Sequence, residues 1–307
     1  MLNDWLLCFL SFRQNEERVT RNLKRMKLIM KQLSCLIALF FSLGVLFGQE
    51  TTKVMTYNIK LDYPKEGKHS WNHRKDLITG QINFYEPHVF GVQEALPNQM
   101  QYLDSTLVSY NYVGVGRDDG KNSGEYSAIF YKKASFEVIE SSTFWLSETP
   151  EKVSMGWDAV CNRVCTYALF KSKKTNQHFW VFNTHFDHVG KQAKKESPKL
   201  ILQKIKELNS KNYPAILMGD FNLKPETESI QFIKKHFNDS KEISETLPFG
   251  PSGTFNGFHF DKPVTHRIDY IFVSKKTIKV SKYAVLSDSK DCKYPSDHLP
   301  VFVFLKF

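Results

Sequence analysis

The sequence predicts an α/β (α+β) fold, a four-layered sandwich in which two mixed β-sheets pack face to face and helices cover the outer faces. Three observations support this prediction. Many short runs rich in β-branched and aromatic residues are bounded by turn residues, which indicates strands. Helical periodicity occurs at separated places between those runs, and no linker or low-complexity tract divides residues 49–307. We therefore expect one domain with a single core.

The predicted elements follow from the period of the apolar residues. Residues 74–85 and 197–208 each place leucine and isoleucine on one helical stripe, a third helix begins at Pro97, where proline is tolerated in the first turn, and residues 227–237 form a fourth. Glycine and proline mark turns at residues 114–124 and 248–257. The coarse order of strands and helices before residue 110 recurs after residue 178. The strand candidates are residues 53–59, 89–92, 125–131, 136–145, 164–170, 178–183, 215–218, 267–273, 279–285 and 301–305.

The N-terminal segment is typical of a secretory signal peptide. Lys27 and Lys31 precede an uncharged apolar run at residues 33–47, and the small residue Gly48 follows it. That run is too short to span a bilayer comfortably. We expect residues 1–25 to be an over-extended N-terminus, residues 26–48 to be a signal peptide, and residues 49–307 to be a secreted or periplasmic monomer with no stable membrane insertion. An uncleaved N-terminal anchor is the alternative.

The charge and cysteine content set further bounds. The chain has 42 Lys and Arg against 32 Asp and Glu, and the excess is dispersed in lysine pairs. This favours phosphate-bearing partners, although solvated surface lysines are the better account of each single pair. Cys161 and Cys165 lie four apart in one expected strand, too far apart to bond to each other, and no cysteine and histidine cluster has zinc spacing. We expect neither a disulfide framework nor a zinc site.

Polar residues stand at the ends of the predicted strands, where a strand-built scaffold presents its chemistry. The run Ser296-Asp297-His298 precedes the last strand, and a carboxylate beside an imidazole can hold a metal-bound phosphate and transfer a proton. Any one of these residues has an ordinary structural explanation, but their combination indicates a site. The other candidates are Asn58, Glu94, His185, Asp220, Asn222 and Asp269.

The ordered motifs resemble those of the endonuclease/exonuclease/phosphatase superfamily of metal-dependent phosphoesterases, and the resemblance covers residues 53–307. It implies that Glu94 is the principal Mg²⁺ ligand, with Asn58 beside it and Asp297 as a metal-side ligand or an acceptor behind it. Mn²⁺ is expected to substitute for Mg²⁺. The motifs are TYNI (56–59), GVQE (91–94), NTH (183–185), GDFN (219–222), RIDY (267–270) and SDHLP (296–300).

The same resemblance implies roles for the remaining candidates. Asp220 would orient and activate the attacking water, and Asn222 would donate to a phosphate oxygen. His298 would contact the scissile phosphate or act as base, with Asp269 fixing its tautomer. His185 would protonate the leaving oxygen. Two weaker candidates for phosphate binding are Arg163 and Tyr126.

These roles imply an exported Mg²⁺-dependent phosphodiesterase that uses in-line attack of an activated water on a phosphoester of nucleic acid, a lipid head group or a phosphorylated glycan. A phosphomonoesterase acting on a sugar or lipid phosphate is the alternative, and a non-catalytic phosphate-binding module is the third hypothesis. His185 counts against abasic-site endonucleases, which generally lack a histidine there. The segment HFDHVG (185–190) is most similar to secreted bacterial members near the deadenylase and sphingomyelinase branches.

Overall fold

The structure is a computed structural model of the 307-residue chain, and it describes residue 13, residues 16–34 and residues 51–307. Contacts within the chain divide it into residues 1–50 and a compact unit of residues 51–307. Residues 16–34 are helical. Across the described ranges, no helix is long and apolar enough to cross a membrane. Most of the predicted signal peptide, residues 35–48, lies outside the described residues, so its assignment stays a prediction.

Two six-stranded sheets form the centre of the compact unit. In each sheet one neighbouring pair is parallel, β1 with β2 and β7 with β8, and the other neighbours are antiparallel. The first sheet has the order β11 (Lys279–Val285), β12 (Val301–Lys306), β1 (Thr52–Asn58), β2 (Val89–Gln93), β4 (Ile129–Lys132) and β3 (Tyr110–Val113). The second has the order β5 (Phe136–Trp145), β6 (Val164–Ser172), β7 (His178–His185), β8 (Ala215–Asp220), β10 (Asp269–Ser274) and β9 (Phe237–Asp239).

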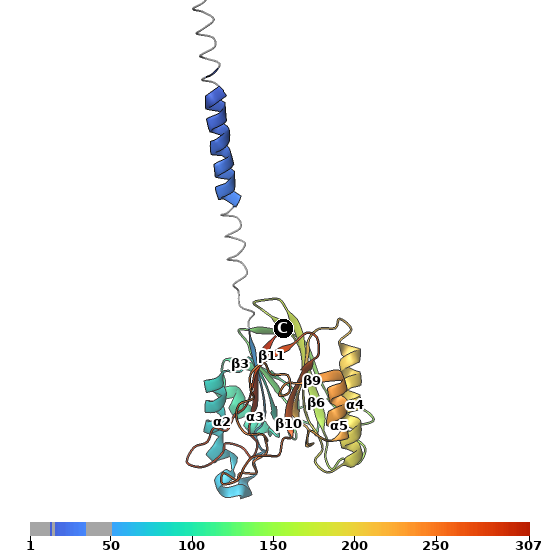
Figure 1. The fold of residues 1–307 in the computed structure, drawn as a ribbon. Helices are drawn as coiled ribbons and strands as arrows, with labels where there is room; N and C mark the ends of the chain where they lie inside the picture. The colour runs from blue at the N-terminus through green and yellow to red at the C-terminus, as the bar shows by residue number, and fades with distance from the viewer. Residues whose placement is uncertain (1–12, 14–15, 35–50) are drawn as a thin grey trace, which may run out of the picture. The chain divides into compact units, whose positions relative to one another are not determined.

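Helices cover the outer face of each sheet, which completes the four layers (Figure 1). The first sheet packs against α2 (Trp71–Tyr85) and α3 (Pro97–Thr106), and the second packs against α4 (Lys191–Leu208) and α5 (Glu228–His236). A short 3₁₀ helix, η1 (Pro64–His69), precedes α2. The fold class that the sequence predicts is confirmed.

Alternation of side chains along the strands fills the layers. In β1, Val54 points into the core between the sheets, whereas Met55 points toward α2 and α3. In β8, Ile216 and Met218 face the first sheet, whereas Leu217 faces α4 and α5. Because both faces of these strands are buried, the strands read as continuous apolar runs in the sequence. Each fully buried large side chain stabilises the fold by roughly 1.5–3 kcal/mol.

Two strand-helix-strand units, β1–α2–β2 and β7–α4–β8, determine where polar groups can meet. The strands of each unit are parallel, so their carboxyl ends lie at one edge of their sheet. β12 runs antiparallel to β1, and β10 runs antiparallel to β8, so the segments that precede β12 and β10 reach the same edge. We call this end of the two sheets, where β1, β2, β7 and β8 finish, the active-site edge.

The structure differs locally from the sequence prediction. The strands β3 and β9 are absent from the prediction because they are only four and three residues long. α4 begins at Lys191 rather than at residue 197, because the distant Asp158 carboxylate accepts hydrogen bonds from the N–H groups of Gln192 and Ala193 in its first turn. The cysteines of residues 51–307 are free thiols.

Candidate active site

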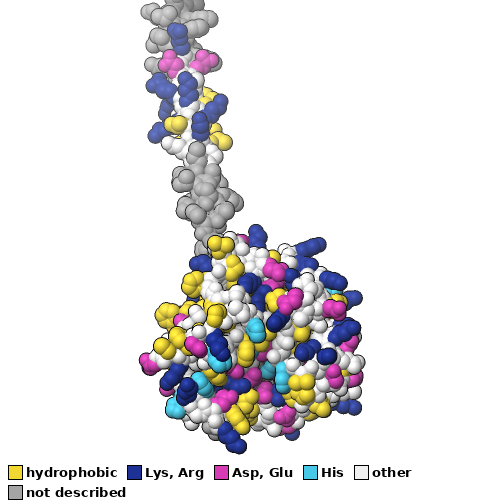
Figure 2. All heavy atoms as spheres, turned by 60° about the horizontal axis from the view of Figure 1, so that its bottom comes forward, with side chains coloured by type: hydrophobic (Ala, Val, Ile, Leu, Met, Phe, Trp, Pro, Cys, Tyr) yellow, Lys and Arg dark blue, Asp and Glu magenta, His cyan; other side chains and the backbone are white. Residues whose placement is uncertain are grey.

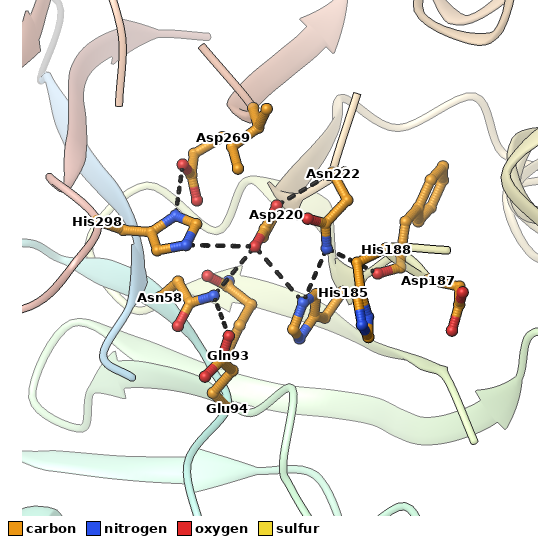
Figure 3. A network of polar contacts seen from close by, with 12 residues as sticks. Asn58, Gln93, Glu94, His185, Asp187, His188, Asp220, Asn222, Asp269 and His298 are labelled. Carbon is orange, nitrogen blue, oxygen red and sulfur yellow. Dashed lines mark hydrogen bonds and ion pairs between the residues drawn. The ribbon is translucent and has the colours of Figure 1, made fainter. Parts of the chain in front are cut away.

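Polar side chains from both sheets converge at the active-site edge (Figure 3). On the surface, acidic and histidine side chains gather together on this face of the molecule (Figure 2). The sequence predicts this convergence, and the structure brings the groups together. Asn58, His185 and Asp220 are the last residues of β1, β7 and β8, Glu94 directly follows β2, Asp269 is the first residue of β10, and His298 lies shortly before β12.

The amide of Asn58 holds two carboxylates close to each other. Its Nδ2 donates to Glu94 Oε1 at 2.9 Å and to Asp220 Oδ2 at 3.0 Å, while its Oδ1 accepts the Lys60 N–H at 3.0 Å. Asn58 therefore presents hydrogen atoms, not its oxygen, to the space between the carboxylates. The resemblance places Asn58 on the metal side beside Glu94, and direct ligation through its oxygen would require the amide to turn over. In the present geometry Asn58 positions the two carboxylates.

Asp220 is a buried acid whose charge is only partly balanced. Its side chain is 1% exposed, and burial together with the nearby Asp269 carboxylate raises the pKa of Asp220 to about 7. The charge of His298 and a 2.9 Å hydrogen bond from the Asn222 N–H oppose this shift. A carboxylate with such a pKa can accept a proton from water near neutral pH.

His298 is held by Asp269, as the sequence predicts. Its Nδ1 lies 2.9 Å from Asp269 Oδ2, and its Nε2 lies 3.8 Å from Asp220 Oδ2. Burial disfavours the charged ring, but Asp269 and Asp220 outweigh burial and raise the pKa of His298 well above 6.5. A protonated imidazole donates hydrogen bonds and accepts no proton. His298 is therefore suited to contact phosphate and unsuited to the alternative role of base.

His185 has the opposite electrostatic environment. Burial and the charges of Arg163 and Arg117 lower the pKa of His185 well below 6.5, so the ring is neutral. Its Nε2 lies 3.1 Å from Asn222 Nδ2 and 3.4 Å from Asp220 Oδ2. Since the Asn222 amide donates, Nε2 is the accepting nitrogen. A neutral His185 holds no proton there for a leaving group, so its predicted role requires a bound anion that raises its pKa.

Strained backbone accompanies the site. Lys60, Glu94 and Asn222 have φ angles of 58°, 62° and 49°. This left-handed conformation costs about 1–2 kcal/mol for most residues, whereas glycine adopts it freely and asparagine adopts it at a lower cost.

The Lys60 ammonium lies close to two acids of the site. Its Nζ is 3.8 Å from Glu94 Oε2 and 3.5 Å from Asp297 Oδ2. Asp297 thus reaches the site beside Lys60, and its predicted contact with a metal stays a prediction.

Sequence reasoning missed Lys60, Glu125 and Arg117. Arg117 Nη1 donates to Glu125 Oε2 at 2.6 Å, and the same oxygen lies 3.8 Å from His185 Nδ1. Burial raises the pKa of Glu125, while Arg117 opposes the shift. The predicted strand 125–131 begins only at Ile129 in the structure, because Tyr126 before it makes isolated bridges to Ala95 and Gly116. In the sequence, Glu125 is a single acid at a strand start and Arg117 is a single arginine in a glycine-rich turn. Neither pattern differs from what is common in proteins, so neither indicates a site.

The two weaker candidates for phosphate binding are both buried. The Tyr126 hydroxyl donates to the Lys121 carbonyl at 3.0 Å, so it fixes its own loop and has no free proton for phosphate. Arg163 Nε lies 3.5 Å from Asp187 Oδ2, and its Nη2 lies 3.0 Å from His188 Nδ1. Arg163 contributes positive potential at His185, and its direct contact with phosphate stays a prediction.

The donor set fits a divalent cation. Potential ligand atoms of Glu94, Asp220 and His298 lie within 4.8 Å of one another. The two carboxylates offer the oxygen ligands that Mg²⁺ and Mn²⁺ prefer. His298 is the weakest of the three, because Asp269 keeps it protonated and an imidazolium has no lone pair on nitrogen. The two carboxylates are therefore the residues that would hold a divalent cation, and His298 stays free for a phosphate.

The two-sheet sandwich and this site define a metal-dependent phosphoester hydrolase. Residues 55–298 match the Endonuclease/Exonuclease/phosphatase family. The chain belongs to this family, and the superfamily that its motifs resemble is confirmed.

Two solved structures from Bacteroides thetaiotaomicron are similar to the compact unit. One is described as an endonuclease/exonuclease/phosphatase family protein; it is 39% identical with a TM-score of 0.81, and the match covers 85% of this chain and 99% of that chain. The other is a mannosyl-6-phosphatase from strain VPI-5482; it is 40% identical with a TM-score of 0.80, and the match covers 83% of this chain and 100% of that chain.

Human nocturnin is a more distant relative. It is 24% identical over an alignment of 293 positions, and the match covers 83% of this chain and 65% of nocturnin. The catalytic domain of human nocturnin with a bound sulfate has a TM-score of 0.68 at 22% identity. That likeness shows a shared fold.

Proposed function

We propose that this protein is an exported Mg²⁺-dependent phosphatase that hydrolyses phosphomonoesters of sugars by in-line attack of an activated water. One observation carries the hydrolytic part of the proposal. The Asp220 carboxylate Oδ2 lies 3.8 Å from His298 Nε2 and, in the absence of a cation, burial raises the pKa of Asp220 to about 7, while Asp269 and Asp220 raise the pKa of His298 well above 6.5. This pair places a proton acceptor for water beside a cationic donor for phosphate.

Two observations favour a phosphomonoester over the diester that the motifs alone suggest. The mannosyl-6-phosphatase relative is 40% identical over 83% of this chain. Moreover, the charges of Arg117 and Arg163 lower the pKa of His185, even though each arginine also lies beside an acid, Glu125 and Asp187. Two cations beside the phosphate site suit a terminal phosphate, which carries more negative charge than a diester.

Phosphodiester hydrolysis is the second candidate. A relative from Mycosarcoma maydis is named as a 3′-5′ exoribonuclease subunit. It is 23% identical, and the match covers 82% of this chain and 49% of that protein. The identity is lower than that of the sugar phosphatase, which is why we rank the diester second.

The residues divide the work as follows. Glu94 and Asp220 would hold Mg²⁺, which would supply positive charge to neutralise the phosphate oxygens. Asp220 orients the attacking water and accepts its proton. His298 donates from Nε2 to a phosphate oxygen, while Asp269 holds the ring by Nδ1.

His185 and Asn222 serve the other side of the phosphate. The Asn222 amide, 3.1 Å from His185 Nε2, donates to a phosphate oxygen once the substrate is bound. The negative charge of the substrate raises the pKa of His185 and lets it take up a proton. His185 then transfers that proton to the leaving oxygen of the sugar.

A substrate panel tests this proposal. It contains mannose 6-phosphate, p-nitrophenyl phosphate, bis(p-nitrophenyl) phosphate, DNA, RNA and sphingomyelin, each with Mg²⁺ and with EDTA. We expect the fastest turnover on mannose 6-phosphate with Mg²⁺, none with EDTA, and a loss of about 10²-fold or more in His298→Ala. A diester as the best substrate would favour the second candidate, and no metal-dependent turnover on any compound would favour a phosphate-binding module.

Export has its own test. N-terminal sequencing of the protein recovered from the periplasm or medium of a bacterial host should give a chain that begins near Gln49. Recovery of the full chain in the cytoplasm, with its N-terminus intact, would contradict export and leave the catalytic proposal untouched.

A further inference from the structure

We infer that the Lys60 ammonium takes the place of a second divalent cation, so that the site binds one metal ion and not two. This inference rests on the proposed cation site between Glu94 and Asp220. It goes beyond that site because it assigns a metal-counting role to a residue that no motif identifies.

The Lys60 ammonium lies between two acids on the side of Glu94 that faces away from Asp220. Its Nζ is 3.8 Å from Glu94 Oε2 and 3.5 Å from Asp297 Oδ2. Glu94 Oε1, in contrast, is turned toward Asn58 and Asp220. A second cation on this side would need Asp297 Oδ2 and Glu94 Oε2, which both lie beside the ammonium, and Glu94 Oε2 also accepts the Leu61 N–H at 3.1 Å.

The position of Lys60 is enforced by the surrounding structure. Its N–H donates to Asn58 Oδ1 at 3.0 Å, and its carbonyl accepts from Arg74 Nη2 at 3.1 Å and from Gln99 Nε2 at 2.9 Å. Its φ angle of 58° is unfavourable for lysine. These three contacts hold the Lys60 backbone in its unfavourable conformation, and the ion pairs with Glu94 and Asp297 place its ammonium.

The balance of charges in the site also supports the binding of a single divalent cation. Asp269 is paired with His298 at 2.9 Å, and Glu125 is paired with Arg117 at 2.6 Å. These two acids have partners of their own.

Three further acids, Glu94, Asp220 and Asp297, share the remaining space with Lys60. When all three carboxylates are ionised, as cation binding favours, three carboxylates and one ammonium leave two negative charges, which one divalent cation balances. Replacing Lys60 by an acid would leave four negative charges, which suit two divalent cations.

Titration with Mn²⁺ tests the inference without relying on activity. The number of Mn²⁺ ions bound per chain is counted by isothermal titration calorimetry and by the loss of the free Mn²⁺ electron paramagnetic resonance signal. The variants are Lys60→Asp, Lys60→Asn and a charge-matched control, Lys68→Asp, on an exposed lysine of η1. Aspartate and asparagine tolerate the left-handed backbone better than lysine, so both variants should fold, which circular dichroism checks.

We expect one ion in the wild type and in Lys68→Asp, and two ions in Lys60→Asp. In Lys60→Asn, which loses the ammonium without gaining an acid, a second and weaker ion is expected. Two ions in the wild type, or a single ion in both Lys60 variants, would overturn the inference. No bound ion in the wild type would overturn both the inference and the proposed use of Mg²⁺, whereas phosphoester turnover in the substrate panel is judged separately.

Discussion

At the residue scale, the site depends on a carboxylate that the fold buries without full compensation. Asp220 is 1% exposed and shares its surroundings with Glu94 and Asp269. Asn58 and His298 reduce the repulsion but do not remove it, since the pKa of Asp220 stays raised to about 7. A residue that is costly to bury and useful as a base is typical of a functional site.

Asp220→Asn keeps the size of the side chain and removes both its charge and its capacity to accept a proton. We expect kcat to fall by about 10²–10⁴-fold, because proton transfer from the attacking water is lost. Asp104→Asn, on the exposed surface of α3, is the matched control and should behave as the wild type. Steady-state kinetics on mannose 6-phosphate and p-nitrophenyl phosphate measure the effect, and a kcat within a factor of about 10 of the wild type would remove Asp220 as the base.

The raised pKa of Asp220 also predicts how stability depends on pH in the absence of metal. Burial raises this pKa from 3.8 to about 7, so the folded chain binds the proton more tightly than the unfolded chain. The stabilisation from this proton is complete below pH 4 and is lost as pH rises to about 7. Urea unfolding in EDTA should therefore show that Asp220→Asn gains stability relative to the wild type between pH 5 and pH 8. If the free energy of unfolding differed between Asp220→Asn and the wild type by the same amount at pH 5 and at pH 8, the burial of an uncompensated carboxylate would be contradicted.

Some site residues could be predicted from sequence and others could not. Glu94 and His298 stand beside apolar strands, so their place at a strand end is visible locally. Lys60 and Glu125 act through neighbours that lie far along the chain, and nothing adjacent to them indicates it. The reversed protonation of the two histidines also depends on long-range contacts, because it is set by Asp269 near His298 and by arginines near His185.

At the element scale, the active-site edge exists because parallel strands end together and the loops beyond them are tied down. Arg74 of α2 is the main tie: its guanidinium donates to the carbonyls of Ile59 at 2.7 Å, Lys60 at 3.1 Å and Pro295 at 2.9 Å. It thus joins the segment after β1 to the segment before β12. Continuous apolar runs made the strands predictable, whereas helix starts such as that of α4 depend on remote side chains.

The two sheets pack closely against each other at Gly91 of β2. A Cβ atom there would lie 2.6 Å from Asn183 Cγ and 2.8 Å from Met218 Cε. Asn183 cannot easily move, because its Nδ2 donates to the carbonyls of Val92 and Ala128, both at 2.9 Å. We expect Gly91→Ala to lower the free energy of unfolding by about 1–3 kcal/mol, the usual effect of overpacking a core.

Gly80→Ala is the matched control for this substitution. Gly80 lies on the exposed side of α2, and an added Cβ meets nothing within 4 Å. The same change should raise the free energy of unfolding by about 0.5–1 kcal/mol, because alanine loses less conformational entropy in a helix. Urea unfolding of both variants decides: equal effects at the two glycines would mean that the sheets are not packed as closely as described.

At the scale of the whole molecule, the site lies on the seam between two sheets and is assembled only when both halves fold together. The hydrogen bond between Asn58 and Asp220 joins residues 162 apart in sequence, and the bond from Ser296 to the Asn58 carbonyl joins residues 238 apart. On the surface of the molecule, acidic and histidine side chains gather on the face at this end of the sheets (Figure 2). The fold class could be predicted because apolar periodicity is local, but the closure of the loops could not.

Anomalous diffraction from crystals grown with Mn²⁺ and inorganic phosphate tests the central claim most directly. The account predicts an anomalous peak between the carboxylates of Glu94 and Asp220, with phosphate beside it in contact with His298. An anomalous peak elsewhere in the molecule, or phosphate bound away from His298, would contradict it.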